Sequence, residues 1–154
     1  MAKYTSTKLF DGYSTVFRQW KAEDTHCRFL HGYAISFRVW FEGELDHRNW
    51  VWDFGGMKRA KTQINGMSPK DYFTWLLDHT TVIAMDDPHL ESFKKMAKDG
   101  LIQLRIIPAT GAEKFAEHLY AKINEFLKEE TQDRVKAVLV EVYENEKNSA
   151  SYGQ

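Results

Sequence analysis

Apolar and polar residues alternate along one stretch in the first third of the chain. The apolar side chains recur at every second position, at Tyr33, Ile35, Phe37, Val39 and Phe41. A period of two predicts a half-buried β-strand. Residues 6–20 and 50–54 are also strand-like, and a polar turn at residues 43–48 precedes the second of them. The simplest pairing therefore joins residues 33–41 and 50–54 as an antiparallel hairpin.

Helical spacing of apolar residues begins after Gly56 and is clearest in the last third of the chain. One helix is predicted over residues 69–77, with Ser68 as its cap and Pro69 in its first position. A longer helix has one continuous apolar face, made of Ala112, Phe115, Ala116, Leu119, Ile123, Phe126 and Leu127. The run from Thr110 to Glu113 has the form of a capping box at its start.

Two further strands are predicted at residues 101–107 and 135–143, the second with Ala137, Leu139, Glu141 and Tyr143 on one face. The elements run strand, strand, strand, helix, strand, helix, strand. This order predicts one α+β domain over residues 1–154, with an antiparallel sheet covered by helices on one face. Residues 145–154 are predicted to form a solvated, flexible tail.

Composition narrows the function classes. The chain has 154 residues, a size that can bury a core without disulfides or structural metals. A formal net charge of -1 argues against a nucleic-acid binder. No apolar run approaches the ~20 residues that cross a bilayer. A single cysteine cannot form an internal disulfide, which suits a reducing compartment, so a cytoplasmic protein is expected.

That cysteine, Cys27, is the first candidate for chemistry. It lies between two predicted strands, with His26, Arg28 and Lys21 close in sequence. Cationic neighbours lower the pKa of a thiol and favour the reactive thiolate, although an isolated cysteine is as often an inert core residue. Elsewhere, Asp78-His79 ends a predicted helix. A carboxylate bonded to one imidazole nitrogen would leave the other free for proton transfer, but a simple surface pair also explains this dipeptide.

Glu141 is a candidate binding residue, because an acid between Leu139 and Tyr143 on one strand face needs a partner. A ligand edge with two adjacent N–H donors, such as that of a pterin, would supply one. The alternative is a charge on an edge strand that faces water. For metal binding, His31 offers one imidazole and His26 a second, whereas catalytic zinc needs three protein ligands and an open position.

Six blocks in order resemble the 6-pyruvoyltetrahydropterin synthase and 6-carboxytetrahydropterin synthase family: Phe17, residues 27–33, residues 51–58, residues 77–79, residues 111–114 and residues 140–142. The resemblance spans roughly residues 8–143. It implies the T-fold, in which an antiparallel four-stranded sheet carries two main helices on one face. It also implies a homo-oligomer, with trimers stacked into hexamers and the pocket at a subunit boundary.

By this resemblance Cys27 matches the catalytic cysteine, Asp78 and His79 its proton-relay partners, and Glu141 the pterin anchor. Glu113 matches a glutamate at a helix start that also lies near the pterin. The implied substrate is 7,8-dihydroneopterin triphosphate. In the carboxylate-forming branch this lyase reaction yields 6-carboxytetrahydropterin, acetaldehyde and triphosphate, on the route to queuosine. Zinc, held by three histidines, is the Lewis acid of the family.

The sequence departs from the family at the metal. His31 matches one expected histidine, Tyr33 replaces the second, and Trp20 or Lys21 stands at the third. Two interpretations follow. Either the chain is an enzyme with a rebuilt zinc site, in which His26 takes part beside His31, or it is a pterin-binding paralogue without zinc and without the parent reaction. The first is preferred, because a mere pterin binder has no use for Cys27 together with an Asp-His pair.

Overall fold

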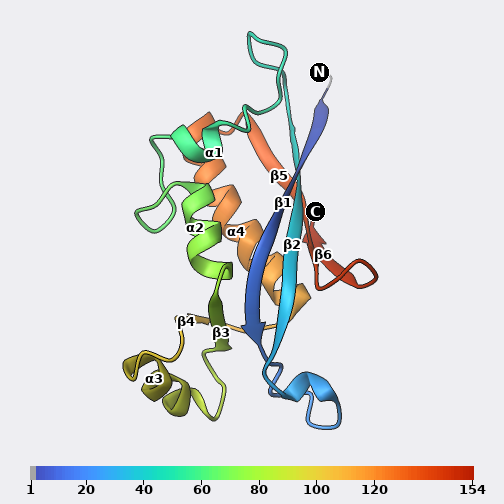
Figure 1. Ribbon diagram of the computed structural model, residues 1–154. Coiled ribbons are helices and arrows are strands. Elements are labelled where there is room, and N and C mark those ends of the chain that lie inside the picture. Colours follow the sequence, from blue (N-terminus) through green and yellow to red (C-terminus); the bar gives the residue numbers. More distant parts are fainter. Residues whose placement is uncertain (1–2) are drawn as a thin grey trace.

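The strands of residues 3–154, the part that the computed structural model describes, form one mixed six-stranded sheet (Figure 1). Its order is β4-β3-β1-β2-β5-β6. The bounds are β1 (Tyr4–Phe17), β2 (His31–Gly43), β3 (Thr80–Ala84), β4 (Leu104–Ile107), β5 (Val135–Tyr143) and β6 (Ser149–Gly153). The α+β class is confirmed. The predicted four-stranded antiparallel sheet is wrong, because β3 and β4 run parallel to β1.

The central hairpin is formed by β1 and β2, not by residues 33–41 and 50–54. The two long strands pair antiparallel from Tyr4 opposite Gly43 to Phe17 opposite His31. Their register shifts between Phe10 and Tyr13, where Gly12 takes a positive φ of 86°. Residues 50–54 form no strand, and the carbonyl of Val51 accepts a hydrogen bond from the Arg134 side chain instead.

Helices α1 (Gly56–Arg59), α2 (Pro69–Leu77) and α4 (Ala112–Thr131) lie on one side of this sheet (Figure 1). Helix α3 (Leu90–Lys98) lies apart from them, beside β3 and β4, and a short 3₁₀ turn, η1 (His26–Arg28), lies between β1 and β2. The cap of α2 is confirmed, since the Ser68 hydroxyl accepts a hydrogen bond from the Asp71 amide at 3.1 Å. Within the described residues, no helix combines the length and apolar character needed to span a bilayer.

The predicted capping box of α4 is wrong. Gly111, with φ 115°, is the N-cap, and no side chain caps this helix. The Thr110 hydroxyl instead donates a 2.6 Å hydrogen bond to the carbonyl of Arg18 at the end of β1. This contact ties the start of α4 to the strand end from which the Cys27 segment departs.

The core lies between the sheet and helices α2 and α4, and aromatic rings fill much of it. Phe37 stacks on Phe10 with ring centroids 4.9 Å apart, and Phe73 of α2 meets both rings edge-on at 5.0 Å. At the far end of β1, Phe17 packs edge-on against Phe115 of α4 at 4.7 Å. The alternation predicted for residues 33–41 thus holds, and it orients β2 so that Ser36 and Arg38 face away from the helices.

A bulge in β5 decides which side chains face the core. Trp40 lies opposite Leu139 while Phe41 lies opposite Ala137, so Val138 is the extra residue. Ala137 is therefore buried with Val140, contrary to the predicted face that it shares with Glu141. The next strand, β6, pairs antiparallel with β5 in the segment predicted as a tail. Residues 149–153 are thus strand, although most of their side chains are exposed.

Candidate functional site

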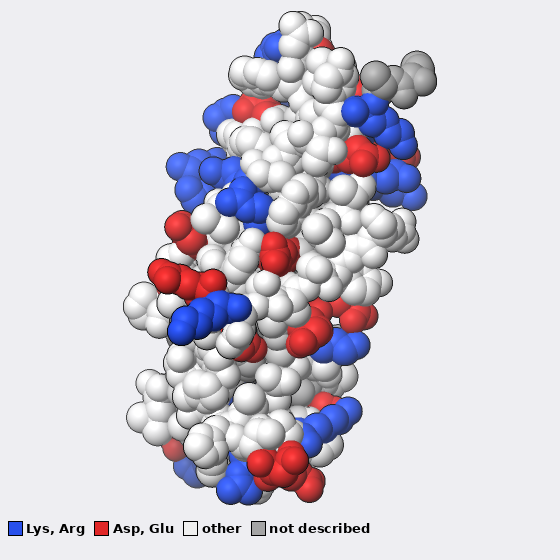
Figure 2. All heavy atoms as spheres, turned by 90° about the vertical axis from the view of Figure 1, so that its right-hand side faces the viewer, with Lys and Arg blue, Asp and Glu red and all other residues white. Residues whose placement is uncertain are grey.

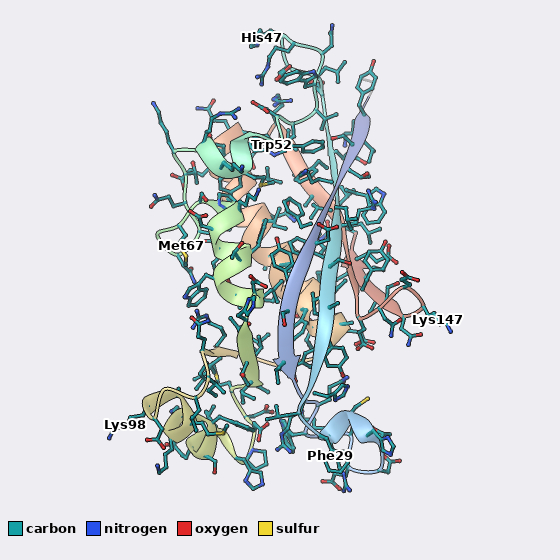
Figure 3. All side chains as sticks on the ribbon, in the orientation of Figure 1. Phe29, His47, Trp52, Met67, Lys98 and Lys147 are labelled. Carbon is teal, nitrogen blue, oxygen red and sulfur yellow. The ribbon has the colours of Figure 1, made fainter. Side chains whose placement is uncertain are left out.

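Cys27 lies in η1, on a loop that folds back on the end of β1. The Cys27 carbonyl accepts a 2.8 Å hydrogen bond from the Gln19 amide, and its own amide donates to the Thr25 hydroxyl at 3.2 Å. The thiol is half-buried and unpaired. Figure 3 shows this loop, marked by Phe29, at the opposite end of the molecule from His47 and Trp52. The loop geometry holds Cys27 close to the start of β2.

A histidine and a tyrosine meet at that strand start. The His31 ring lies 4.4 Å from the Tyr33 ring, and its Nδ1 donates to the carbonyl of Phe29 at 3.0 Å, which leaves Nε2 free of that bond. Burial first, and then the charges of Glu144 and Cys27, together raise the pKa of Tyr33 to about 12. Tyr33 therefore stays a protonated hydroxyl near the thiol. From the sequence, Tyr33 was predicted only to replace a metal-binding histidine, and its position near Cys27 was not predicted.

A groove of about 790 Å³ opens beside these rings on the uncovered face of the sheet, lined by Leu9, His31, Gly32, Tyr33, Ala34, Ser36, Arg38, Tyr143, Glu144, Asn145 and Glu146. Figure 2 looks onto this side of the molecule, where basic and acidic side chains are interspersed among uncharged ones. The groove is large enough for a small organic ligand. Its polar groups come from β2 and from the turn between β5 and β6.

Glu141 stands beside this groove, opposite Arg38 in the pairing of β5 with β2. The Tyr143 hydroxyl donates to its Oε1 at 2.6 Å and the Ser149 hydroxyl to its Oε2 at 2.7 Å. These two hydrogen bonds, with help from the charge of Arg38, hold the pKa of Glu141 below its usual value. The residue is thus an ionised acceptor, and each carboxylate oxygen keeps a lone pair for a further donor.

Asp78 and His79 form the predicted pair at the junction of α2 and β3. Asp78 Oδ2 lies 3.1 Å from His79 Nδ1, and Oδ1 accepts a 3.0 Å hydrogen bond from the Ser14 amide. The Ser14 contact first, and the imidazole second, keep the pKa of Asp78 low. His79 has φ 58°, a left-handed conformation that costs energy in a non-glycine residue, and its side chain is 77% exposed. The imidazole is oriented and accessible.

One protomer does not bring these groups together. His79 lines a separate groove of about 390 Å³ with Ser14 and residues 100–103, on the side of β1 away from β2. From β3 to β5 the sheet spans three strand spacings, about 14 Å, so His79 is remote from Glu141. Glu113 is exposed in the first turn of α4. Of Cys27, His79 and Glu141, only His79 lines either of these two grooves.

An ion pair that the sequence analysis missed holds the Cys27 loop. The Arg18 guanidinium donates two hydrogen bonds to the Asp87 carboxylate, at 2.8 and 2.7 Å, and a third to the carbonyl of Arg28 at 3.2 Å. The Asp87 side chain is only 1% exposed and that of Arg18 17%. Burial disfavours the charge of Asp87, but the Arg18 contact and the hydrogen bond from the His89 amide together outweigh it and keep the pKa below the usual value. The two residues are 69 positions apart in the chain, so no local sequence motif predicts their contact.

The donors present do not fit the zinc that the family resemblance implies. Within residues 3–154, no three His, Cys, Asp or Glu side chains gather closely enough to hold a metal ion. The residues at the third ligand position are engaged elsewhere: the Trp20 indole donates to Asp86 at 3.1 Å, and the Lys21 ammonium pairs with the same carboxylate at 3.6 Å. A lysine at this position also repels a cation. His26 and His31 therefore remain a proposed pair of ligands without a third.

Comparison with known proteins decides the family. A model described as 6-pyruvoyl tetrahydropterin synthase matches residues 10–154. The chain belongs to this family. The match covers nearly the whole sequence, so the resemblance inferred from the six sequence blocks is confirmed. A comparison with curated proteins gave no match.

Solved structures agree with this fold at low sequence identity. An uncharacterized protein from Wolinella succinogenes matches with a TM-score of 0.78 and 20% identity, covering 100% of this chain and 99% of the other. The 6-pyruvoyl tetrahydropterin synthase of Caenorhabditis elegans matches with a TM-score of 0.62 and 19% identity, over 100% and 97%. That of Plasmodium vivax gives 0.65 and 14%, over 98% of each chain. The synthase fold is thus shared by this divergent family member.

Proposed function

We propose that this member of the 6-pyruvoyl tetrahydropterin synthase family is a lyase of the 6-carboxytetrahydropterin synthase type. Its substrate is 7,8-dihydroneopterin triphosphate, in the pathway to queuosine and related deazapurines. Cys27, Asp78 and His79 transfer protons, and Glu141 binds the pterin with Glu113 nearby. The observation that carries this proposal is the Asp78–His79 contact of 3.1 Å, which orients an exposed imidazole in a chain that also has a half-buried free thiol.

Each residue has a chemical task suited to its surroundings. Asp78 fixes the proton on His79 Nδ1, which leaves Nε2 to take or give a proton on the pterin side chain. The Cys27 thiolate is the second base, and the hydroxyl of Tyr33 is a hydrogen-bond donor beside it. Glu141 accepts the paired N–H donors of the pterin ring with the lone pairs that Tyr143 and Ser149 leave unused.

The site requires a second protomer. Because His79 and Glu141 lie on different sides of the β1–β2 hairpin, the proposal assigns the Asp-His pair of one subunit to the pocket that contains Cys27 of its neighbour. This matches the homo-oligomer, trimer or hexamer, that the family resemblance implies. No step is assigned to zinc, since the donors of the chain do not form its site.

The decisive experiment is incubation of the purified oligomer with 7,8-dihydroneopterin triphosphate, followed by mass analysis of the products. We expect 6-carboxytetrahydropterin and acetaldehyde, and a loss of about a hundredfold or more in kcat/KM for Cys27→Ala and for His79→Ala. The matched control is His47→Ala, which lies at the opposite end of the molecule (Figure 3). Normal turnover by the Cys27 variant would show the catalytic assignment to be wrong.

Mixing the two inactive variants tests whether the site is shared between subunits. After unfolding and joint refolding of equal amounts, some pockets combine the intact Cys27 of one chain with the intact His79 of another. Activity should return to about a quarter of the wild-type value if partners mix at random. No recovery, with mixed oligomers demonstrated by mass spectrometry, would place both groups in the pocket of one chain.

The second candidate function is a pterin-binding paralogue without the parent reaction. The mismatch between the donors of this chain and a zinc site favours it. Here Glu141→Gln abolishes binding of a pterin measured by titration calorimetry, whereas Cys27→Ala leaves the affinity unchanged and no product forms. The same assays, run with and without added zinc and combined with elemental analysis, distinguish this paralogue from an enzyme with a rebuilt metal site.

A further inference from the structure

A third groove, away from the proposed pterin site, is lined by several basic side chains. It has a volume of about 350 Å³ and lies where β1 meets α1 and the start of α2, lined by Lys8, Phe10, Phe54, Gly55, Met57, Lys58, Arg59 and Lys70. Trp52, just before this segment, marks the end of the molecule remote from the Phe29 loop (Figure 3). None of the candidate catalytic residues lines this groove. We call it the basic groove, after its four cationic side chains, Lys8, Lys58, Arg59 and Lys70.

Carboxylates do little to balance this charge. Asp53 is shared between Arg59 at 3.0 Å and Arg48 at 3.4 Å, and its other oxygen accepts from the Gly55 amide. Among the described residues, the structure shows no ion pair for Lys8, Lys58 or Lys70. Three lysines thus converge on one groove with a single arginine that is already paired.

The convergence costs energy in the unliganded chain. Contact with the Lys58 ammonium and its charge, followed by weaker effects of burial and of Lys8, lowers the pKa of Lys70, and the charge of Asp71 offsets only part of this. Lys70 also lies in the first turn of α2, where the helix dipole disfavours a cation. An anion bound between these cations would offset their mutual repulsion.

The groove is shaped as well as charged. The Lys8 ammonium lies over the rings of Phe10 and Phe54, at 5.8 and 5.9 Å from their centroids, which holds it against the wall. A Cβ at Gly55 would come within 2.5 Å of the Arg59 guanidinium. The guanidinium therefore lies against bare backbone, and glycine at this position leaves room for it.

We propose that the basic groove binds a phosphate-type anion, with a polyphosphate chain as the preferred ligand. Several separate cations around one groove suit an anion that carries several charged oxygens better than a single carboxylate. Such a chain occurs free or as the triphosphate group of a nucleotide-like ester, and the two sources share this chemistry. The site is independent of the pterin proposal, because it uses neither Cys27 nor Glu141.

The test is titration calorimetry of the intact oligomer with tripolyphosphate at low ionic strength. We expect one saturable site per chain, with an affinity that falls as salt screens the charges. The Lys58→Gln/Lys70→Gln double variant should bind about tenfold more weakly or worse. The matched control is Lys94→Gln/Lys98→Gln on α3, which removes the same net charge from exposed positions elsewhere and should keep wild-type affinity.

Guanosine triphosphate in a parallel titration identifies the source. Equal affinity for both ligands means that the phosphate chain alone is recognised, and tighter binding of the nucleotide means that an ester is preferred; both results support the site. The proposal is overturned if tripolyphosphate gives no saturable binding, or if the two double variants lose affinity equally. Thermal unfolding of each variant confirms that it is folded, since the replaced side chains are exposed.

Discussion

Replacing Asp87 by alanine tests whether the Arg18–Asp87 ion pair holds the β1 end and the Cys27 loop together. The change removes two hydrogen bonds to a guanidinium, at 2.7 and 2.8 Å, and leaves Arg18 without its carboxylate partner. Breaking a buried pair in this way costs about 3–5 kcal/mol. Because Arg18 is 17% exposed, water compensates part of the loss, so we expect about 2–4 kcal/mol in the free energy of unfolding.

Urea unfolding at pH 7 measures this value, and the melting temperature should fall by about 5–15 °C. The pKa of Asp87 is lowered in the folded state. The Asp87 carboxylate therefore contributes fully to the free energy of unfolding above its pKa in the unfolded state, near 3.9. This contribution is lost as the pH falls through the lower pKa of the folded state. The difference in the free energy of unfolding between wild type and Asp87→Ala should become smaller below about pH 4.

The matched control for this experiment is Asp99→Ala, which removes the exposed partner of Lys95 on α3. An exposed i,i+4 pair is worth only about 0.3–0.5 kcal/mol. Reaction of the sole thiol with a disulfide reagent should be severalfold faster in Asp87→Ala and unchanged in Asp99→Ala. Equal stability losses in the two variants, or an unaltered rate for Cys27, would refute the reasoning.

The remaining predictions concern a strained residue, a helix cap and a tuned carboxylate. His79→Gly should raise the unfolding free energy by about 1 kcal/mol, because glycine adopts a φ of 58° without cost, while the proposed lyase activity is lost; unfolding and product assays check the two effects. Ser68→Ala should cost about 1 kcal/mol in urea unfolding, since the Asp71 amide loses its acceptor. Tyr143→Phe removes the first cause of the lowered Glu141 pKa, so an NMR titration should place that pKa closer to its ordinary value. Pterin binding in this variant should then be lost at a higher pH than in wild type, and an unmoved pH profile would contradict the assignment.

The sequence predicted local structure well where one periodicity governs a whole element. The apolar face of α4 and the alternation of β2 are both present in the structure. Pairing was harder, because it depends on contacts between distant segments. β3, for example, is buried along its full length, so it has no alternation to identify it. The bulge at Val138 likewise changes the face of Ala137 without any signal in composition.

For the candidate site, too, contacts between neighbours in the chain could be predicted, whereas contacts between distant segments could not. The Asp78–His79 contact could be predicted because both partners are adjacent in the chain. The donors of Glu141 could not, since Ser149 reaches it only through pairing of β6 with β5. Arg18 and Asp87 were missed for the same reason. Where a site depends on side chains brought together by tertiary structure, residue type and spacing do not reveal it.

The pairing of β6 with β5 has a practical consequence for handling this protein. Ser149 remains on Glu141 only while the last strand stays attached at the margin of the sheet. Removal of β6 by truncation or proteolysis would take the Ser149 hydroxyl away and leave Tyr143 as the remaining hydroxyl donor to Glu141. Loss of this strand should therefore change the affinity of Glu141 for a ligand without any mutation of Glu141 itself.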